Sequence, residues 1–235
     1  MTSKMLQKAR DFEKKYLPYT QSEQPRFHVT GGIGWINDPN GFAPYKGEYH
    51  LFFQYYPYDT KWGPMHWGHV KTRDFIHWER LPAALAPDTE YDRNGCFSGG
   101  AVELPDGRHL LMYTGVRTAR RRNGKIDEYQ TQCLAIGDGV DYEKLPCNPV
   151  IDASQLPEGG SVHDFRDPKI WRDGEHFTMI RFKPETSTIK VDRTHSTGSS
   201  SASSPPATTS TGGCGSARIS SRWTGRMCCL SPRRR

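Results

Sequence analysis

Residues 35–55 read WINDPNGFAPYKGEYHLFFQY, and this stretch indicates β-structure. Glu48–Tyr55 is rich in aromatic side chains and follows the turn Lys46-Gly47-Glu48, which is typical of a β-hairpin. Similar short runs bounded by turn residues recur along the chain, at Met65–Lys71, Ala101–Leu104, His109–Gly115 and Gln130–Ile136. No helical pattern separates them, so the sequence predicts an all-β fold, either a sandwich, a barrel or a propeller.

A short helix is expected before the first strand. Within residues 4–16, apolar side chains stand at helical spacing among Lys, Arg and Glu, namely Met5, Leu6, Ala9, Phe12 and Tyr16. A second hairpin is indicated by Pro105-Asp106-Gly107. We therefore expect a helical segment at residues 1–22 and a β domain at residues 23–185.

The chain changes character near residue 185. From Thr194 to Gly213 it is mostly Ser, Thr, Gly, Pro and Ala, which cannot bury enough apolar surface to offset the entropy lost on ordering. Residues 186–235 carry eight Lys or Arg and one acid, a net charge of +7; since the whole chain carries +6, residues 1–185 carry −1. The sequence thus predicts a disordered tail at 186–235 and a body that lacks the basic surface required by nucleic acid.

Cysteine usage and hydropathy bear on location. The body holds an odd, widely spaced set, Cys96, Cys133 and Cys147, which fits a reducing compartment better than a disulfide framework. The N-terminus has no apolar segment typical of a signal peptide, and no run of roughly 18 apolar residues occurs. We therefore expect a cytoplasmic protein that does not associate with membranes.

Asp38 is the first candidate for chemistry. Proline at 39 disfavours the α region for the residue before it, and Pro39-Asn40-Gly41 is typical of a chain reversal. We therefore expect Asp38 at the end of a strand, with its carboxylate fixed beside Trp35 and Asn37. Such an acid can serve as a nucleophile toward a small polar ligand. The alternative is an aspartate that only caps a turn.

Three motifs occur in order along the body: Trp35–Gly41, Phe97-Ser98-Gly99 and Phe165-Arg166-Asp167-Pro168-Lys169. Together with Gln54, Trp62 and the segment from Asp74 to Trp78, they resemble glycoside hydrolase family 32, the invertases, sucrose-6-phosphate hydrolases and related β-fructosidases. The resemblance covers roughly residues 15–180. It implies a five-bladed β-propeller followed by a β-sandwich, of which this chain would hold only the N-terminal blades. It also implies retaining hydrolysis of terminal β-D-fructofuranosyl units of sucrose or sucrose 6-phosphate.

The resemblance assigns roles to particular residues. Asp38 would be the catalytic nucleophile, and Asp167 would hydrogen-bond ring hydroxyls and stabilise the transition state. The fructose subsite would be lined by Trp35, Asn37, Gln54, Trp62, Phe97, Ser98 and Arg166. Such a set suits a furanoside, because its dense hydroxyl groups need carboxylates, an arginine and amides beside an aromatic wall. Pro168 is expected to restrain Asp167 at a strand end, as Pro39 restrains Asp38. No cofactor and no metal are expected, and the only expected partner is the sugar.

Retaining hydrolysis also needs a second carboxyl group, which protonates the leaving oxygen and then activates water. In this family it is the Glu of a Trp-Glu-Cys-Pro-Asp motif, and this chain contains no such motif. The motif can, however, be encoded in the neighbouring reading frame. If translation starts on the third base of the Gly213 codon, codons allowed for Cys214 and the residues after it can read Met-Trp-Glu-Cys-Pro-Asp. We infer that residues from somewhere in 181–193 onward are translated out of frame. The chain as written is expected to hydrolyse no fructoside, because losing general acid catalysis alone costs about 10²–10⁴-fold.

Other interpretations stay open. The chain could be a non-catalytic fructoside-binding fragment, or a fructosyltransferase of the same fold in which a sugar accepts the fructosyl unit. Arg117–Arg122 is expected to be a solvated loop, the alternative being a contact with a substrate phosphate. A set of histidines without matching carboxylate spacing is expected to pack or hydrogen-bond rather than to bind metal: His28, His50, His66, His69 and His77.

Overall fold

The computed structural model describes residues 2–155, 164–173, 176–181, 187–191, 215–219 and 223–227. Within these ranges the chain is mostly β-sheet, with one α-helix at the N-terminus and two 3₁₀ turns. The α-helix is α1 (Lys4–Thr20), and the 3₁₀ turns are Gln21–Glu23 and Ala153–Gln155. The first sheet is an antiparallel meander in the order β1 (Trp35–Tyr45), β2 (Glu48–Tyr56), β3 (His66–Thr72) and β4 (Glu79–Leu85).

Two further antiparallel sheets follow in the chain. The second has the order β5 (Gly95–Glu103), β6 (His109–Arg120), β7 (Ile126–Gly137) and β8 (Tyr142–Lys144). The third has the order β9 (Lys169–Asp173), β10 (His176–Arg181), β11 (Ser187–Val191), β12 (Gly215–Ile219) and β13 (Trp223–Met227). Every apolar run identified in the sequence lies within a strand, to within one residue at either end, and both predicted hairpin turns connect neighbouring strands, so the all-β prediction is confirmed.

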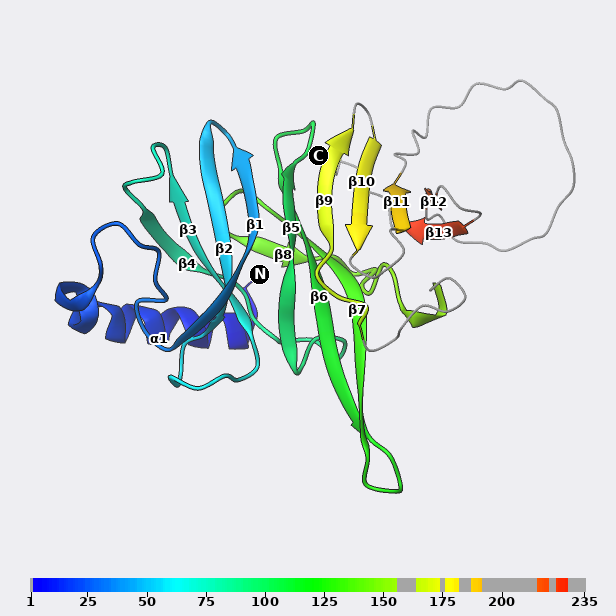
Figure 1. Ribbon diagram of the computed structural model, residues 1–235, viewed down its shortest axis with the longest axis horizontal. Coiled ribbons are helices and arrows are strands. Elements are labelled where there is room, and N and C mark those ends of the chain that lie inside the picture. The colour runs from blue at the N-terminus through cyan, green and yellow to red at the C-terminus, as the bar shows by residue number, and fades with distance from the viewer. Residues whose placement is uncertain are drawn as a thin grey trace, which may run out of the picture.

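The sheets lie side by side through their first strands. β1 contacts β5 and β5 contacts β9, and Figure 1 shows these three strands running alongside one another in that order. Each sheet therefore presents its first strand at a common junction and extends outward from it. Successive propeller blades are built in this way. The closure of five such blades is not tested by this structure and stays a prediction.

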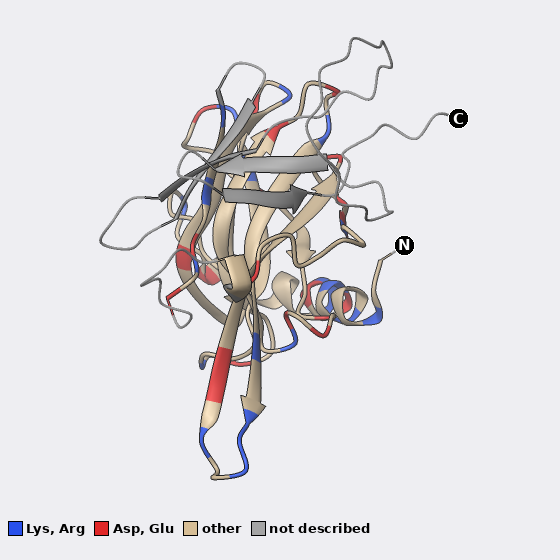
Figure 2. Cartoon of the chain, turned by 90° about the vertical axis from the view of Figure 1, so that its right-hand side faces the viewer, with Lys and Arg blue, Asp and Glu red and all other residues tan. Residues whose placement is uncertain are grey.

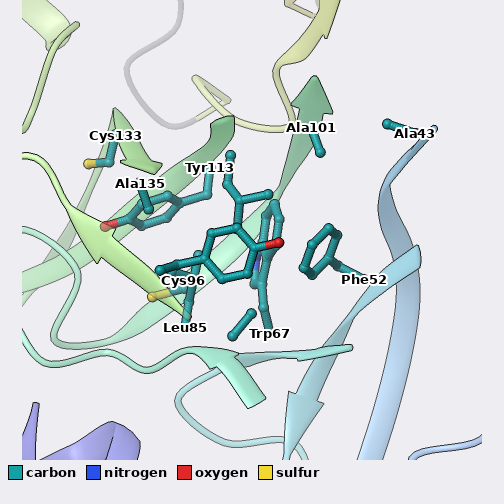
Figure 3. Close-up of a cluster of buried hydrophobic side chains, with 12 residues drawn as sticks. Ala43, Phe52, Trp67, Leu85, Cys96, Ala101, Tyr113, Cys133 and Ala135 are labelled. Carbon is teal, nitrogen blue, oxygen red and sulfur yellow. The ribbon is translucent and has the colours of Figure 1, made fainter. Parts of the chain in front are cut away.

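The largest core cluster joins the first two sheets. Trp67 of β3 is fully buried and packs against Phe52 of β2 at 5.3 Å between ring centroids and against Tyr113 of β6 at 6.3 Å. Figure 3 shows these rings meeting between the sheets, with Leu85 and Cys96 beside them. Burying a large side chain of this kind contributes about 1.5–3 kcal/mol, so the cluster fixes how the two sheets are positioned.

A buried ion pair adds to this junction. The ammonium of Lys144 on β8 lies 2.5 Å from carboxylate oxygens of both Asp88 and Asp92, and its side chain is 12% exposed. The Asp92 side chain is fully buried and also accepts a hydrogen bond from the Tyr113 hydroxyl at 2.8 Å. Burial lowers the pKa of Lys144, but the neighbouring negative charges outweigh it and hold that pKa above its ordinary value. The lysine is therefore charged in the folded protein.

Helix α1 covers the outer strand of the first sheet. Ser3 caps it, because its side chain accepts a hydrogen bond from the Leu6 amide, and Leu6 and Ala9 pack against alanines of the β4 region. The buried Glu13 carboxylate accepts a hydrogen bond from the backbone N–H of Ala83 at 3.0 Å, so the helix also supplies a partner for a backbone group at the edge of the sheet. The predicted short helix is confirmed, and it continues four residues beyond the amphipathic pattern of residues 4–16, to Thr20.

The expected chain reversal after Asp38 is wrong. β1 runs without interruption from Trp35 to Tyr45, and two irregularities in its pairing with β2, one on each side of Pro39 and Asn40, take the place of a turn. Gly41 has φ +57°, and a Cβ there would lie 2.6 Å from the ring of Phe52. The Pro-Asn-Gly sequence therefore kinks a strand, since bulges use the same proline and glycine chemistry as turns. Asp38 lies inside β1, near its start.

The tail is only partly described. The prediction of disorder at residues 186–235 is not confirmed, because the structure describes β11, β12 and β13 within that range. The stretch from Thr194 to Gly213, on which the prediction was based, lies outside the described residues. The division into segments 1–22, 23–185 and 186–235 stays a prediction.

Candidate active site

The irregular start of β1 presents Asp38 to solvent. Its pairing with β2 shifts register between Ile36 and Pro39, so the intervening residues leave the regular ladder. The Asp38 carboxylate is exposed and lies 3.5 Å from the hydroxyl of Ser98 on β5, which donates toward it. Beside it, the indole N–H of Trp35 donates to the side-chain oxygen of Asn37 at 2.8 Å. These predicted site residues thus lie together.

β5 supplies the second part of the site. The register of its pairing with β6 also shifts between Phe97 and Gly99, so Ser98 lies at a β-bulge. The indole N–H of Trp67 donates to the Phe97 carbonyl at 3.1 Å and holds this bulge against the first sheet. Trp62 is 55% exposed and meets the Phe97 ring edge to face at 6.1 Å. The two rings form an accessible aromatic wall.

Gln54 has a different position from the one predicted. Its side chain is 2% exposed, and its amide nitrogen donates to the Cys96 carbonyl at 3.0 Å. Gln54 therefore ties β2 to β5 directly behind Phe97 and Ser98. The structure places it next to the predicted subsite, with its amide N–H committed to the backbone.

Asp167 lies two residues before β9 and has an unusual backbone conformation. Its φ is +59°, whereas the proline after it was expected to restrain it to an extended conformation, so that expectation is wrong. Left-handed backbone is uncommon outside glycine, and such conformations are concentrated at functional sites. The Asp167 amide donates to the Thr114 hydroxyl at 3.0 Å.

Three features of the surroundings act on the carboxyl group of Asp167. The pKa of Asp167 is raised, with partial burial as the largest cause; the Arg166 guanidinium lowers it, and the negative charge of Asp38 raises it. The Arg166 guanidinium lies 3.6 Å from the Asp167 carboxylate and 3.1 Å from that of Asp164. Two carboxylates and an arginine beside exposed aromatic rings form a surface suited to a ligand rich in hydroxyl groups.

Sequence reasoning missed two buried polar residues at this site. Thr114 on β6 and Gln132 on β7 face each other across the ladder and are fully buried. Gln132 donates to the Phe165 carbonyl at 2.7 Å, so both residues contact the segment that carries Asp167. Neither belongs to a motif that the sequence singled out. The signal available was Thr114, a polar residue after four apolar ones in His109–Gly115; Gln132 follows Gln130 and Thr131 and does not stand out in its strand.

The arginine-rich segment lies away from the site. Arg117 and Arg120 belong to β6 and Arg121 to the turn after it, in a two-stranded hairpin that projects from the sheets with basic residues at its tip (Figures 1 and 2). Arg120 is six residues beyond Thr114, which corresponds to about 20 Å along a strand. The predicted solvated loop is thus largely a β-hairpin, whose tip lies well beyond Thr114 along the strand.

The histidines mostly pack, as predicted. His50 and His69 are buried and lie 2.9 Å apart through ring nitrogens, and buried His66 hydrogen-bonds the Pro64 carbonyl. His77 is exposed and hydrogen-bonds Asp74. Among the described residues, no group of three or more His, Cys, Asp or Glu side chains is arranged to hold a metal ion. In the same part of the chain, no helix is long and apolar enough to span a bilayer.

These residues define the class of site, two carboxylates and an arginine beside aromatic rings, and comparison with known proteins gives the family. The profile described as the glycosyl hydrolases family 32 N-terminal domain matches residues 28–194. The chain belongs to glycosyl hydrolase family 32.

The chain also matches curated relatives and a solved structure. A sucrose-6-phosphate hydrolase of Zymomonas mobilis is 46% identical over 181 residues, covering 75% of this chain and 34% of that protein. A raffinose invertase of Escherichia coli is 43% identical over 157 residues, covering 66% and 31%. The structure of a family 32 β-fructofuranosidase from Bombyx mori matches with TM-score 0.64 and 39% identity, covering 78% of this chain and 39% of that one. This chain thus spans about a third of the length of the curated relatives.

Proposed function

We propose that the site formed by Asp38, Ser98, Arg166 and Asp167 binds the fructosyl unit of sucrose or sucrose 6-phosphate. The observation that carries the proposal is geometric: Asp38 of β1 lies beside the Ser98 hydroxyl of β5, and β5 contacts β9, which begins two residues after Asp167. Relatives named as sucrose-6-phosphate hydrolases, and a Bombyx mori family 32 structure in complex with sucrose, support the sugar class.

The roles follow from the positions of the acids. Asp38 is exposed at a strand irregularity with the Ser98 hydroxyl aimed at it, which suits a nucleophile that attacks the anomeric carbon. Asp167 is half-exposed beside Arg166, which suits an acceptor for ring hydroxyls. The aromatic pair of Trp62 and Phe97 would cover the apolar face of the sugar.

We further propose that this chain binds the fructosyl unit without turning it over. The Trp-Glu-Cys-Pro-Asp motif that would supply the acid/base is absent from the sequence, and the family match ends at residue 194, next to the inferred change of reading frame. A complete gene product with that motif would hydrolyse the fructoside with retention of configuration. A cytoplasmic location also stays a prediction; the three cysteines Cys96, Cys133 and Cys147 are free thiols.

Binding and hydrolysis are tested separately. Titration calorimetry of this chain with fructose, sucrose and sucrose 6-phosphate should show binding, and a reducing-sugar assay should show no hydrolysis. Asp167→Asn should weaken binding, whereas Asp11→Asn, an exposed acid on α1, should leave it unchanged. Absence of binding to all three sugars by the folded chain would refute the proposed site.

The reading frame is tested with DNA. Resequencing the codons for residues 181–193 and restoring one base should extend the frame through the missing motif and give sucrose hydrolysis. In that restored protein, Asp38→Asn should abolish turnover. Stop codons soon after the restored base would show that the tail has another origin.

A further inference from the structure

The backbone of Asp167 is held in its unusual conformation by two side chains from the second sheet. Asp167 has φ +59° and stands before a proline, two features that independently disfavour this conformation. A strained residue of this kind persists only when its surroundings over-determine it. The contacts that hold residues 165–167 are therefore part of how the site is built.

Those contacts come from Thr114 and Gln132. The Thr114 hydroxyl accepts the Asp167 amide at 3.0 Å, and the Gln132 amide donates to the Phe165 carbonyl at 2.7 Å. One residue thus holds an N–H and the other a C=O of a three-residue segment. Both side chains are fully buried, so neither is positioned to touch a sugar itself.

Thr114 also reaches Ser98, which lies on the opposite side of the site. The Thr114 hydroxyl proton has two acceptors in range, the Gln132 side-chain oxygen at 3.3 Å and the Ser98 carbonyl at 3.4 Å. The hydroxyl of Ser98 in turn faces the Asp38 carboxylate. A continuous polar path through the second sheet therefore connects the segments that carry Asp38 and Asp167.

We propose that Thr114 and Gln132 are positioning residues that set the orientation of the Asp167 carboxylate toward the bound sugar. They act through the backbone of residues 165–167, not by contact with the ligand. The inference rests on the proposed function for its effect on sugar binding. The hold on the backbone itself is independent of any ligand.

The test compares shape-conserving variants of Thr114. Thr114→Val keeps the volume and removes the acceptor of the Asp167 amide, whereas Thr114→Ser keeps the hydroxyl. The valine variant should exchange the Asp167 amide hydrogen at least about tenfold faster and bind fructose about tenfold more weakly, since the Asp167 N–H loses the hydroxyl that accepts it. The serine variant should restore both quantities. Thr131→Val on β7, whose hydroxyl contacts the Gly115 carbonyl, should change neither.

A second variant guards against misfolding of the first. Gln132→Met removes the donor to the Phe165 carbonyl and should weaken fructose binding in the same direction, with unchanged far-ultraviolet circular dichroism. Wild-type amide protection and wild-type affinity in both Thr114→Val and Gln132→Met would overturn the inference, as would failure of Thr114→Ser to restore them. If the unsubstituted chain binds no sugar, the proposed function fails, and exchange of the Asp167 amide alone decides whether the pair holds this backbone.

Discussion

A cluster of three buried histidines makes the junction between the first two sheets sensitive to acid. His50 of β2, His69 of β3 and His109 of β6 are at most 3% exposed. The His50 ring lies 5.0 Å from that of His69 and 5.4 Å from that of His109, between ring centroids. Burial is the largest cause that lowers the pKa of each of them. The folded protein therefore holds them neutral.

The size of the effect can be worked out for His109. Its pKa is lowered to about 3, against about 6.5 in an unfolded chain. Between these two values the unfolded chain binds a proton that the folded chain does not, so stability falls as the pH falls. From pH 7 to pH 5 the loss is about 1.9 kcal/mol for this group alone. His66, with its pKa lowered to about 4, adds a similar amount.

Together these two groups remove about 4 kcal/mol over that interval, a large part of the roughly 5–15 kcal/mol that stabilises a typical domain. The measurement is urea denaturation followed by tryptophan fluorescence at pH 7 and pH 5, in the chain and in His109→Phe. Phenylalanine keeps the ring stacked on Tyr45, whose ring lies 4.3 Å from that of His109, but binds no proton.

The variant should lose about 2 kcal/mol less than the unsubstituted chain between the two pH values. His28→Gln, which changes an exposed histidine, should leave the pH dependence as it was. Since the carboxylates titrate equally in all three proteins, their contribution cancels in the comparison. An equal pH-dependent loss in His109→Phe and in the unsubstituted chain would refute the assignment of a neutral buried imidazole.

Three further predictions concern stability and binding. Lys144→Met should lower the free energy of unfolding by about 3–5 kcal/mol in urea denaturation, because the carboxylates of Asp88 and Asp92 lose their cation. Lys125→Met, which changes an exposed lysine, should change the free energy of unfolding by no more than about 0.5 kcal/mol. Equal losses in the two variants would contradict this account. Gly41→Ala should cost more than about 1 kcal/mol, because the added Cβ meets the ring of Phe52 at positive φ; an unchanged melting temperature would contradict it. Trp62→Ala should weaken fructose binding about tenfold in calorimetry and leave the melting temperature unchanged, because Trp62 is exposed. An unchanged affinity would show that Trp62 does not contact the sugar.

The sequence predicted the strands well because their signals are local. Glu48–Tyr55 and His109–Gly115 are rich in aromatic and aliphatic residues and each begins at a hairpin turn, and β2 and β6 contain them. The prediction of a chain reversal after Asp38 was wrong because its signal does not depend on local sequence alone. Proline and glycine mark turns and bulges alike, and only the pairing partner of β1 decides between the two.

The candidate site could be predicted only in part. Motifs identified Asp38, Ser98 and Asp167, and the structure brings the segments that carry them together. Thr114 and Gln132 escaped notice because their role is a contact between sheets, which leaves no spacing pattern in one strand. The left-handed backbone of Asp167 also contradicts the local rule for a residue before proline, since tertiary contacts override that preference.

The arrangement of the sheets supports the proposal that this chain binds the sugar without turning it over. Asp38, Ser98 and Asp167 lie near the starts of the first strands of three consecutive sheets, so the groups proposed to face the sugar all belong to the described residues. The bonds that align these strands, such as Trp67 to the Phe97 carbonyl, also lie within that body. A catalytic acid supplied by a later segment would complete the chemistry without being needed to shape this surface. Fructose affinity in a chain without hydrolysis is therefore the outcome that this architecture predicts.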